Sequence, residues 1–188
     1  GKKEAGDMSS LSVFEDTRPG VPLLQTHDAA EIATALAPFG IRFERWDAVQ
    51  PPAKDADEAT VLATYRPWLD RLMGETGAGS ADVLRVNAQT PNKEALRSKF
   101  LSEHTHSEDE VRFFVHGGGH FIMHIKGRVY DVECTQGDLI SVPEGYKHWF
   151  DAGPQPDMVT LRIFTHKEGW VAQYTGADIA RQFPSFSS

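Results

Sequence analysis

Three histidines and one glutamate are spaced so that they can hold a metal ion. His104 and His106 stand two residues apart, so both imidazoles point to the same side of an extended segment. Glu110 follows four residues after His106, an even offset, and a strand that begins there aims its carboxylate at the same cavity. His148 ends a turn rich in Pro and Gly, from which it can enter the cavity from a neighbouring wall.

These donors favour one particular class of metal. Three imidazoles and one carboxylate suit a divalent transition metal better than calcium or magnesium. Four protein ligands on an octahedral ion leave two adjacent positions open, as binding of a substrate through two oxygens requires. A His-x-His pair alone is weak evidence for a metal site. The evidence is stronger here because Glu110 follows the pair and because Gly137, Pro143 and Gly145 precede His148 in a second regular block. We therefore expect one metal ion per chain.

The composition excludes several classes of function. The 188 residues include 19 Lys and Arg against 27 Asp and Glu, a formal net charge of −8, which argues against nucleic acid or an anionic membrane as the main partner. No apolar run approaches the ~20 residues of a spanning helix. The lone cysteine, Cys134, excludes an internal disulfide and any CxxC motif, so a reducing compartment fits best. We expect a cytoplasmic monomer.

The sequence indicates one domain after a short segment at the N-terminus. Residues 1–7 resemble the remnant of an expression tag and are left out of the fold argument. Residues 8–188 are expected to form a single domain with three parts. Mixed helices and strands over 8–100 pack on a metal-binding barrel core over 101–165, and 166–188 form a C-terminal tail.

The first half of the chain mixes helices and short strands. Asp28 starts a helix with a capping-box arrangement, and the segment 38–40 ends it with Pro and Gly. A second helix is expected over 57–73, and Pro67 should kink or divide it. The other expected elements are strands over 11–14, 41–43 and 81–86, and a helix over 91–100 with Pro91 in its first turn.

The second half is rich in strands. Segments of about five residues recur with turn residues between them, a pattern typical of a small barrel or sandwich. A small barrel has a mouth that can hold one ligand. The expected strands cover 111–115, 121–125, 128–133, 139–142, 147–151 and 158–164, with a turn over 116–120 and a short helix in the tail. The fold class is therefore mainly β with flanking helices.

The two metal-binding blocks resemble those of the cupin superfamily, whose fold is a small β-barrel or double-stranded β-helix. One departure is Ala152, which stands where many cupins have Asn, at a position that is not a ligand. More narrowly, the chain resembles the acireductone dioxygenase family from Met8 to Ala180. Another departure is in the turn over 116–120: the family often has acidic or longer side chains at the two positions where this chain has His116 and His120. The stretches that carry the narrower resemblance are 104–114 (HTHSEDEVRFF), 138–143 (DLISVP), 148–151 (HWFD) and 168–173 (EGWVAQ).

This resemblance implies a function. A member of the family cleaves acireductone, 1,2-dihydroxy-3-keto-5-methylthiopentene, with O2 in methionine salvage. The cofactor is Fe2+ or Ni2+. The iron form yields formate and 4-methylthio-2-oxobutanoate, and the nickel form yields formate, carbon monoxide and 3-methylthiopropanoate. Two alternatives stay open: another metal-dependent cupin enzyme, such as an isomerase or a different dioxygenase, and a non-catalytic cupin that binds a small molecule. The latter predicts an incomplete ligand set, whereas all four ligand types are present.

Two arginines are candidates for contact with the substrate. Arg112 follows Glu110 by two residues, so a strand directs it to the same cavity, where it can pair with an anionic oxygen. The alternative is a structural ion pair, and the resemblance favours the substrate. Arg162 interrupts an apolar strand and invites a buried partner, so structural and substrate roles are equally open for it.

The remaining aromatic, histidine and cysteine residues carry weaker predictions. Three aromatics could wall the pocket, although aromatics at strand ends are more often core: Phe100, Phe150 and Trp170. Three further histidines are not expected to bind the metal, because no matching carboxylate block accompanies them: His116, His120 and His124. Cys134 is expected to be a small buried apolar residue.

Overall fold

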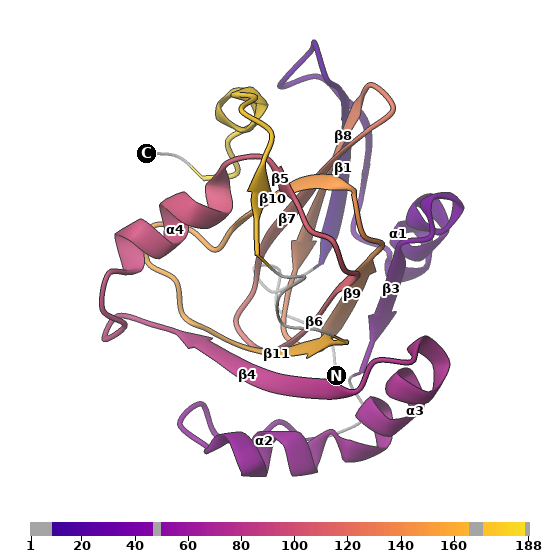
Figure 1. The fold of residues 1–188 in the computed structure, drawn as a ribbon. Helices are drawn as coiled ribbons and strands as arrows, with labels where there is room; N and C mark the ends of the chain where they lie inside the picture. The colour runs from indigo at the N-terminus through magenta and orange to yellow at the C-terminus, as the bar shows by residue number, and fades with distance from the viewer. Residues whose placement is uncertain (1–8, 47–49, 166–170, 187–188) are drawn as a thin grey trace.

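Two antiparallel β-sheets face each other and form the body of the protein (Figure 1). The computed structural model describes residues 9–46, 50–165 and 171–186. The predicted tag remnant, 1–7, and Trp170 lie outside these residues. The mainly β class with flanking helices is confirmed.

In the described part of the chain one sheet has seven strands and the other five. The order across the first is β12 (Gln173–Tyr174), β5 (His104–Thr105), β10 (Lys147–Asp151), β7 (Gly119–Ile125), β8 (Arg128–Cys134), β1 (Ser10–Glu15) and β2 (Pro22–Thr26). The order across the second is β3 (Arg42–Arg45), β9 (Asp138–Val142), β6 (Glu110–His116), β11 (Met158–Phe164) and β4 (Ser80–Val86).

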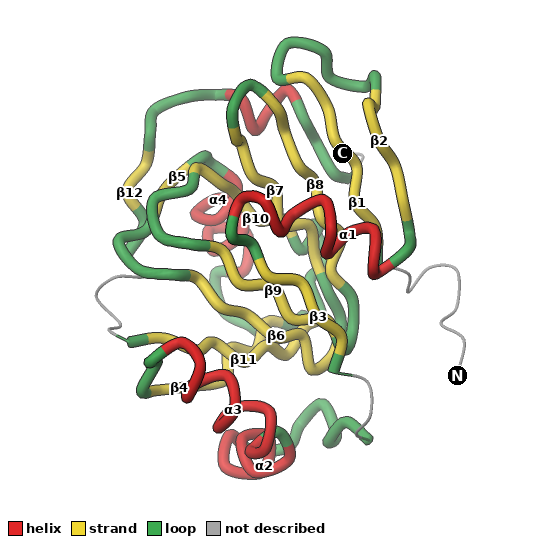
Figure 2. Tube along the Cα trace, turned by 90° about the vertical axis from the view of Figure 1, so that its right-hand side faces the viewer, coloured by secondary structure: helices red, strands yellow, loops and turns green. Residues whose placement is uncertain are grey.

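Helices cover the outside of the barrel. α2 (Glu58–Thr64) and α3 (Arg66–Thr76) lie against the outer face of β4 and β11, while α4 (Lys93–Leu101) lies at another side of the barrel (Figure 1). α1 (Ala29–Leu36) packs beside β3, as Figure 2 shows, and continues into η2 (Ala37–Phe39). The short helix predicted in the tail is η4 (Ile179–Gln182). Among the described residues no helix is long and apolar enough to cross a membrane.

The space between the sheets is the main core. Alternate side chains of each strand point inward, so Phe121 and Met123 of β7 meet Phe114 of β6 and Ile140 of β9 in one buried cluster. Cys134 belongs to the same cluster and is fully buried, as the sequence predicts.

A second core lies between the five-stranded sheet and the two helices α2 and α3. Phe113 of β6 stacks on Trp46 at 4.7 Å between ring centroids and meets Tyr65 edge-on at 4.8 Å. Leu69 and Leu72 of α3 are buried in the same cluster. The five-stranded sheet is therefore buried on both faces, and this fixes which side chains of β6 turn inward.

Most of the helix predictions for the first half are confirmed. The Asp28 carboxylate accepts the backbone N–H of Glu31 and caps α1, and Gly40 ends η2 in the left-handed conformation. Tyr65 separates α2 from α3, and Pro67 stands in the first turn of α3, so the predicted division is confirmed.

The helix predicted over 91–100 begins two residues later. Asn92, which caps α4, has a φ of 56°, in the left-handed region, and a right-handed helix cannot include such a residue. Placing Pro91 in the first turn was therefore wrong. Two strands, β2 and β12, were also missed. β2 is largely exposed and β12 has only two residues, so neither has a hydrophobic alternation to recognise.

The turn predicted over 116–120 is narrower, because His116 ends β6 and His120 lies in β7. A Cβ atom at Gly117 would stand 2.1 Å from the Asp157 carbonyl oxygen, and one at Gly118 would stand 2.0 Å from that of Cys134. Only glycine allows the chain to pass so close to these two backbones.

His120 and His124 lie on the outer face of β7, since the alternate residues Phe121, Met123 and Ile125 belong to the inner core. His120 is held by two carboxylates: Nδ1 is 2.7 Å from Asp131 Oδ1 and Nε2 is 3.0 Å from Glu133 Oε2. Burial alone would lower the pKa of His120, but the hydrogen bonds to these two residues raise it to about 10.

We predict that this cluster makes stability depend on pH. The pKa of His120 is about 10 in the folded chain against 6.5 as its ordinary value, so the stabilisation is complete below pH 6.5 and is lost as the pH rises through 10. Hydrogen bonds to a charged group are worth about 1.5–3 kcal/mol each. Urea unfolding at pH 6 and pH 10 should show a smaller decline for His120→Gln than for the unmodified protein. Equal declines would contradict the prediction.

Candidate metal centre

The four predicted ligands are brought together from both sheets. β5 and β10 are neighbours in the seven-stranded sheet, and His104 pairs directly with His148 across them. His106 follows β5, and Glu110 is the first residue of β6 in the five-stranded sheet. The even spacing of His104, His106 and Glu110 does put all three on one side, as predicted.

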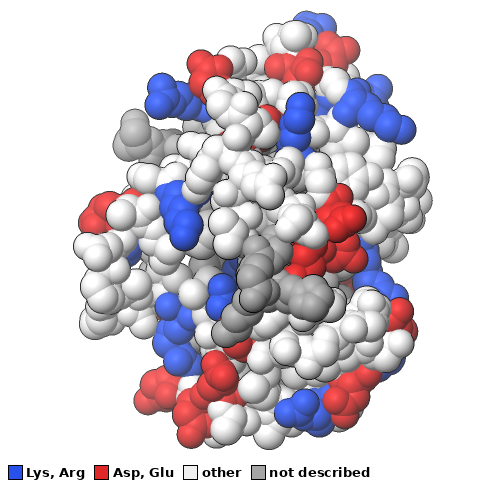
Figure 3. All heavy atoms as spheres, in the orientation of Figure 1, with Lys and Arg blue, Asp and Glu red and all other residues white. Residues whose placement is uncertain are grey.

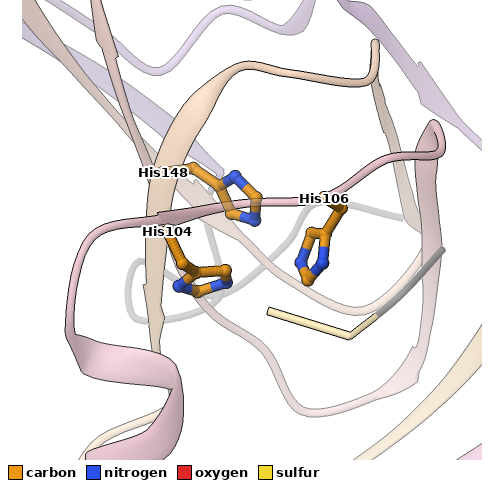
Figure 4. Close-up of side chains that lie close together, drawn as sticks. All are labelled: His104, His106 and His148. Carbon is orange, nitrogen blue, oxygen red and sulfur yellow. The ribbon is translucent and has the colours of Figure 1, made fainter. Parts of the chain in front are cut away.

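The three imidazoles surround a common point, as Figure 4 shows. Their ring centroids are 4.9 Å apart for His104 and His106, 4.4 Å for His104 and His148, and 4.9 Å for His106 and His148. One nitrogen of each ring lies within 4.8 Å of a nitrogen of each of the others, and all three residues are buried. This is the geometry of a three-histidine site for a metal ion.

Backbone carbonyls orient two of the rings. Nδ1 of His104 donates to the Ser102 oxygen at 2.7 Å, and Nδ1 of His148 donates to the Tyr146 oxygen at 2.9 Å. Because Nδ1 carries the proton, the lone pair of the neutral ring is on Nε2, the atom that faces the cluster and would bind a metal.

The carboxylate of Glu110 closes the fourth side of the cluster. Its Oε2 lies 2.9 Å from His148 Nε2, and its Oε1 lies 3.8 Å from His106 Nε2. Burial alone would raise the pKa of Glu110, but His148, Arg112 and His106 together hold it well below its usual range. Glu110 is therefore ionised although it is buried.

The cluster fits a divalent metal ion. The buried atoms Glu110 Oε2 and His148 Nε2 face each other, yet neither makes a hydrogen bond of regular geometry with a described residue. Burial lowers the pKa of His104 to about 4, and it also lowers that of His106. Both rings are consequently neutral near pH 7, the form that binds metals. Nitrogen and oxygen donors of this kind suit first-row transition metals.

Arg112 lies beside the metal-binding group. Its Nη2 donates to Glu110 Oε1 at 3.2 Å, and its Nη1 donates to Thr160 Oγ1 at 3.5 Å. The guanidinium carbon lies 5.6 Å from the centroid of the Phe150 ring. The sequence prediction that Arg112 faces the same cavity as Glu110 is confirmed.

A cavity of about 540 Å³ opens over the cluster. It has a polar floor, formed by His104, His106, Glu110 and Arg112. The rest of its wall is mostly apolar and consists of Leu84, Leu96, Lys99, Phe100, Arg162, Phe164, Val171, Ala172 and Tyr174.

The predicted pocket residues have different outcomes. Phe100 lines the cavity. Phe150 is absent from its described lining and packs behind Arg112 and against Phe100, with 6.3 Å between the two ring centroids. Arg162 lines the cavity and also makes two hydrogen bonds of 2.7 Å to Asp82. It therefore has a charged partner, although Asp82 is only partly buried and not fully buried as the sequence suggested.

Sequence reasoning missed several lining residues. Leu84, Leu96 and Phe164 reach the cavity from β4, α4 and β11, and Tyr174 reaches it from β12. An apolar residue in a strand or helix carries no local signal that separates a pocket wall from a core, so these could not be found in the sequence. The hydroxyl of Tyr174 donates to the Lys99 backbone oxygen at 2.7 Å and ties β12 to α4.

Comparison with known proteins identifies close relatives. Residues 10–172 match the ARD/ARD' family. The acireductone dioxygenase of Gluconacetobacter diazotrophicus is 66% identical over 177 residues, which cover 94% of this chain and 99% of the relative. That of Gluconobacter oxydans is 65% identical over 178 residues, which cover 95% of each.

A solved structure shares the fold. The acireductone dioxygenase from Bacillus anthracis, which has a cadmium ion in its active centre, superposes with a TM-score of 0.79 at 31% sequence identity. The superposition covers 90% of this chain and 100% of the other.

We predict that removing any of the four candidate ligands weakens metal binding. His148→Ala and Glu110→Ala should each lower affinity by more than about tenfold, because changes even to groups that only support ligands cost that much. His120→Ala should keep one metal ion per chain, since His120 lies on the outer face. Metal content after dialysis, measured by plasma mass spectrometry, checks this. Full occupancy in His148→Ala would remove that residue from the site.

Proposed function

Since this chain belongs to the ARD/ARD' family, whose members here are acireductone dioxygenases, we propose in detail how it acts on acireductone and dioxygen. The protein is an enzyme of methionine salvage with a three-histidine metal site. The observation that carries the proposal is the convergence of His104, His106, Glu110 and His148 at the polar floor of a cavity whose wall is mostly apolar; the first three line that floor, and His148 lies against them.

The proposed cofactor is one Fe2+ or Ni2+ ion per chain, held by these three histidines and Glu110. Such an ion acts as a Lewis acid and as a template for an oxygen-donor substrate. The donors are borderline nitrogens and a hard oxygen, so the site accepts more than one first-row metal.

The residues of the chain prepare the substrate for reaction. Acireductone is an enediol that ionises readily, and the permanently charged guanidinium of Arg112 stabilises the enediolate. This interaction is strong because Arg112 is only 4% exposed and water does not screen it. Glu110, held ionised, keeps Arg112 oriented through their 3.2 Å hydrogen bond.

The apolar wall fits the methylthio end of the substrate. Leu84, Leu96, Phe100 and Phe164 offer apolar surface on one cavity, whereas the oxygens of the enediol face the polar floor. In this proposal Arg162 contacts the substrate from the cavity wall, and its hydrogen bonds to Asp82 fix its orientation. The Phe150 ring packs against the guanidinium of Arg112 and supports it. A role for Trp170 in the pocket stays a prediction from the sequence.

The proposal needs no second subunit. One chain supplies all four ligand candidates and a cavity of sufficient volume, which supports a monomer. Residues 8–188 act as one domain, since β1 and α1 share a core with β7 and β9.

Acidic and basic side chains are interspersed over the described residues of the face in Figure 3, unlike the basic patches that bind nucleic acid. The lone buried cysteine supports a cytoplasmic location.

Arg112→Leu should separate binding of the metal from turnover. Metal content should stay near one per chain, because the four ligands remain, while kcat falls by about 100-fold or more, as when a group that stabilises transition-state charge is lost. Stopped-flow loss of acireductone absorbance under air measures the rate. A rate near that of the unmodified enzyme, with metal retained, would make Arg112 a structural residue.

The proposed function is tested by loading one batch of metal-free protein with iron or with nickel. The iron form should yield formate and 4-methylthio-2-oxobutanoate, and the nickel form formate, carbon monoxide and 3-methylthiopropanoate. Acireductone consumption no faster than the metal-free background in both forms would overturn the proposal. That result would favour another cupin activity or a binding module. Identical products would remove only the dependence of the products on the metal.

A further inference from the structure

A second, much smaller cavity, partly open to solvent, lies between α4 and the end of the barrel. Its volume is about 20 Å³, so it holds one very small guest. Most of its wall is apolar, and the described residues that form it are Val86, Lys93, Leu96, Arg97, Phe100, Phe150, Ala152, Gly153, Pro156 and Met158.

The two cavities share a wall. Leu96 and Phe100 line both of them, so each of these side chains has one surface toward the metal cavity and another toward the small one. The Phe150 ring continues this wall, meeting Phe100 edge-on and carrying the Arg112 guanidinium 5.6 Å from its centroid. The small cavity is therefore separated from the metal cavity by the thickness of single side chains.

The position of Phe150 depends on a glycine. A Cβ atom at Gly119 would stand 2.5 Å from the Phe150 Cζ, so only glycine leaves room for the ring. Arg97 of α4 also lines the small cavity, and its Nε and Nη2 donate to the Asp151 carboxylate at 2.9 and 3.1 Å. These contacts fix α4 over the cavity and keep the Arg97 charge directed to a carboxylate.

We propose that this small apolar cavity is a binding site for dioxygen beside the metal cavity. The inference rests on the proposed function, which makes dioxygen the second substrate. An uncharged diatomic molecule prefers apolar surroundings to water, and apolar cavities in proteins take up such guests as xenon. The cavity is too small for acireductone, whereas the neighbouring cavity of about 540 Å³ holds the organic substrate.

The arrangement gives the two substrates separate routes. Acireductone binds in the large cavity above His104, His106 and Glu110. Dioxygen held behind Leu96 and Phe100 enters the metal cavity through that wall after rotation of one side chain. Binding of dioxygen here is non-covalent.

Xenon tests the site without any turnover. Crystals of the unmodified protein pressurised with xenon should show an anomalous peak among Leu96, Phe100, Phe150 and Ala152. Ala152→Leu, which fills the cavity, should abolish the peak. Ala33→Leu is the matched control, because Ala33 is a partly buried alanine of α1 that lines neither cavity, and it should keep the peak. The absence of a peak in the unmodified protein would overturn the proposal.

Kinetics of the metal-loaded enzyme test the role of the site. Ala152→Leu should raise the KM for dioxygen by about threefold or more, with the KM for acireductone and kcat at saturating dioxygen unchanged. Ala33→Leu should leave the KM for dioxygen unchanged. Thermal unfolding shows whether each variant is folded, and Ala152→Val, a smaller change, replaces Ala152→Leu if the latter does not fold.

The outcomes separate this proposal from the proposed function. An unchanged KM for dioxygen in a folded, xenon-free variant would overturn the dioxygen site. A rise in the KM for acireductone instead would mean that the apolar tail of the substrate occupies the cavity, and would also overturn it. If the unmodified enzyme did not consume acireductone, the proposed function itself would fail, and the xenon result would show whether the cavity binds an apolar guest.

Discussion

The charge of Glu110, buried where the two sheets meet, constrains the rest of the site. An ionised carboxylate that is 6% exposed is stable only if other groups replace the water that it has lost. Arg112 does so on one side, because its Nη2 donates to Glu110 Oε1 at 3.2 Å. Arg112 is itself buried, so it needs Thr160 and the face of Phe150 in turn. A divalent metal among the histidines would complete the compensation, because it adds positive charge opposite the carboxylate.

This compensation depends on strand register. His148 stands opposite His104, and Glu110 opposite Val142; a slip of one residue would turn each side chain to the other face. Register is fixed because the five-stranded sheet is apolar on both faces: Phe114 packs inward, and Phe113 packs outward under α2 and α3. By packing on this sheet, α2 and α3 therefore help to fix the position of Glu110, the candidate ligand that it carries.

Local features of the sequence were sufficient to predict which candidate ligands converge on one cavity, but not their surroundings. Parity of spacing along an extended segment predicted that Glu110 shares a cavity with His104 and His106, and most strands and helices followed from periodicity. The pairing of Arg162 with Asp82 joins residues distant in sequence, and the position of Phe150 depends on the close approach of Gly119. Both depend on tertiary contacts, which no local pattern reveals.

The central claim is that Glu110 and the three histidines bind a single metal ion. A crystal structure of the iron-loaded protein, with anomalous data collected at the iron edge, tests this claim most directly. The account predicts one anomalous peak per chain, coordinated by Nε2 of His104, His106 and His148 and by a carboxylate oxygen of Glu110. An iron ion bound elsewhere, or bound by the histidines while Glu110 stays paired only with Arg112, would contradict it.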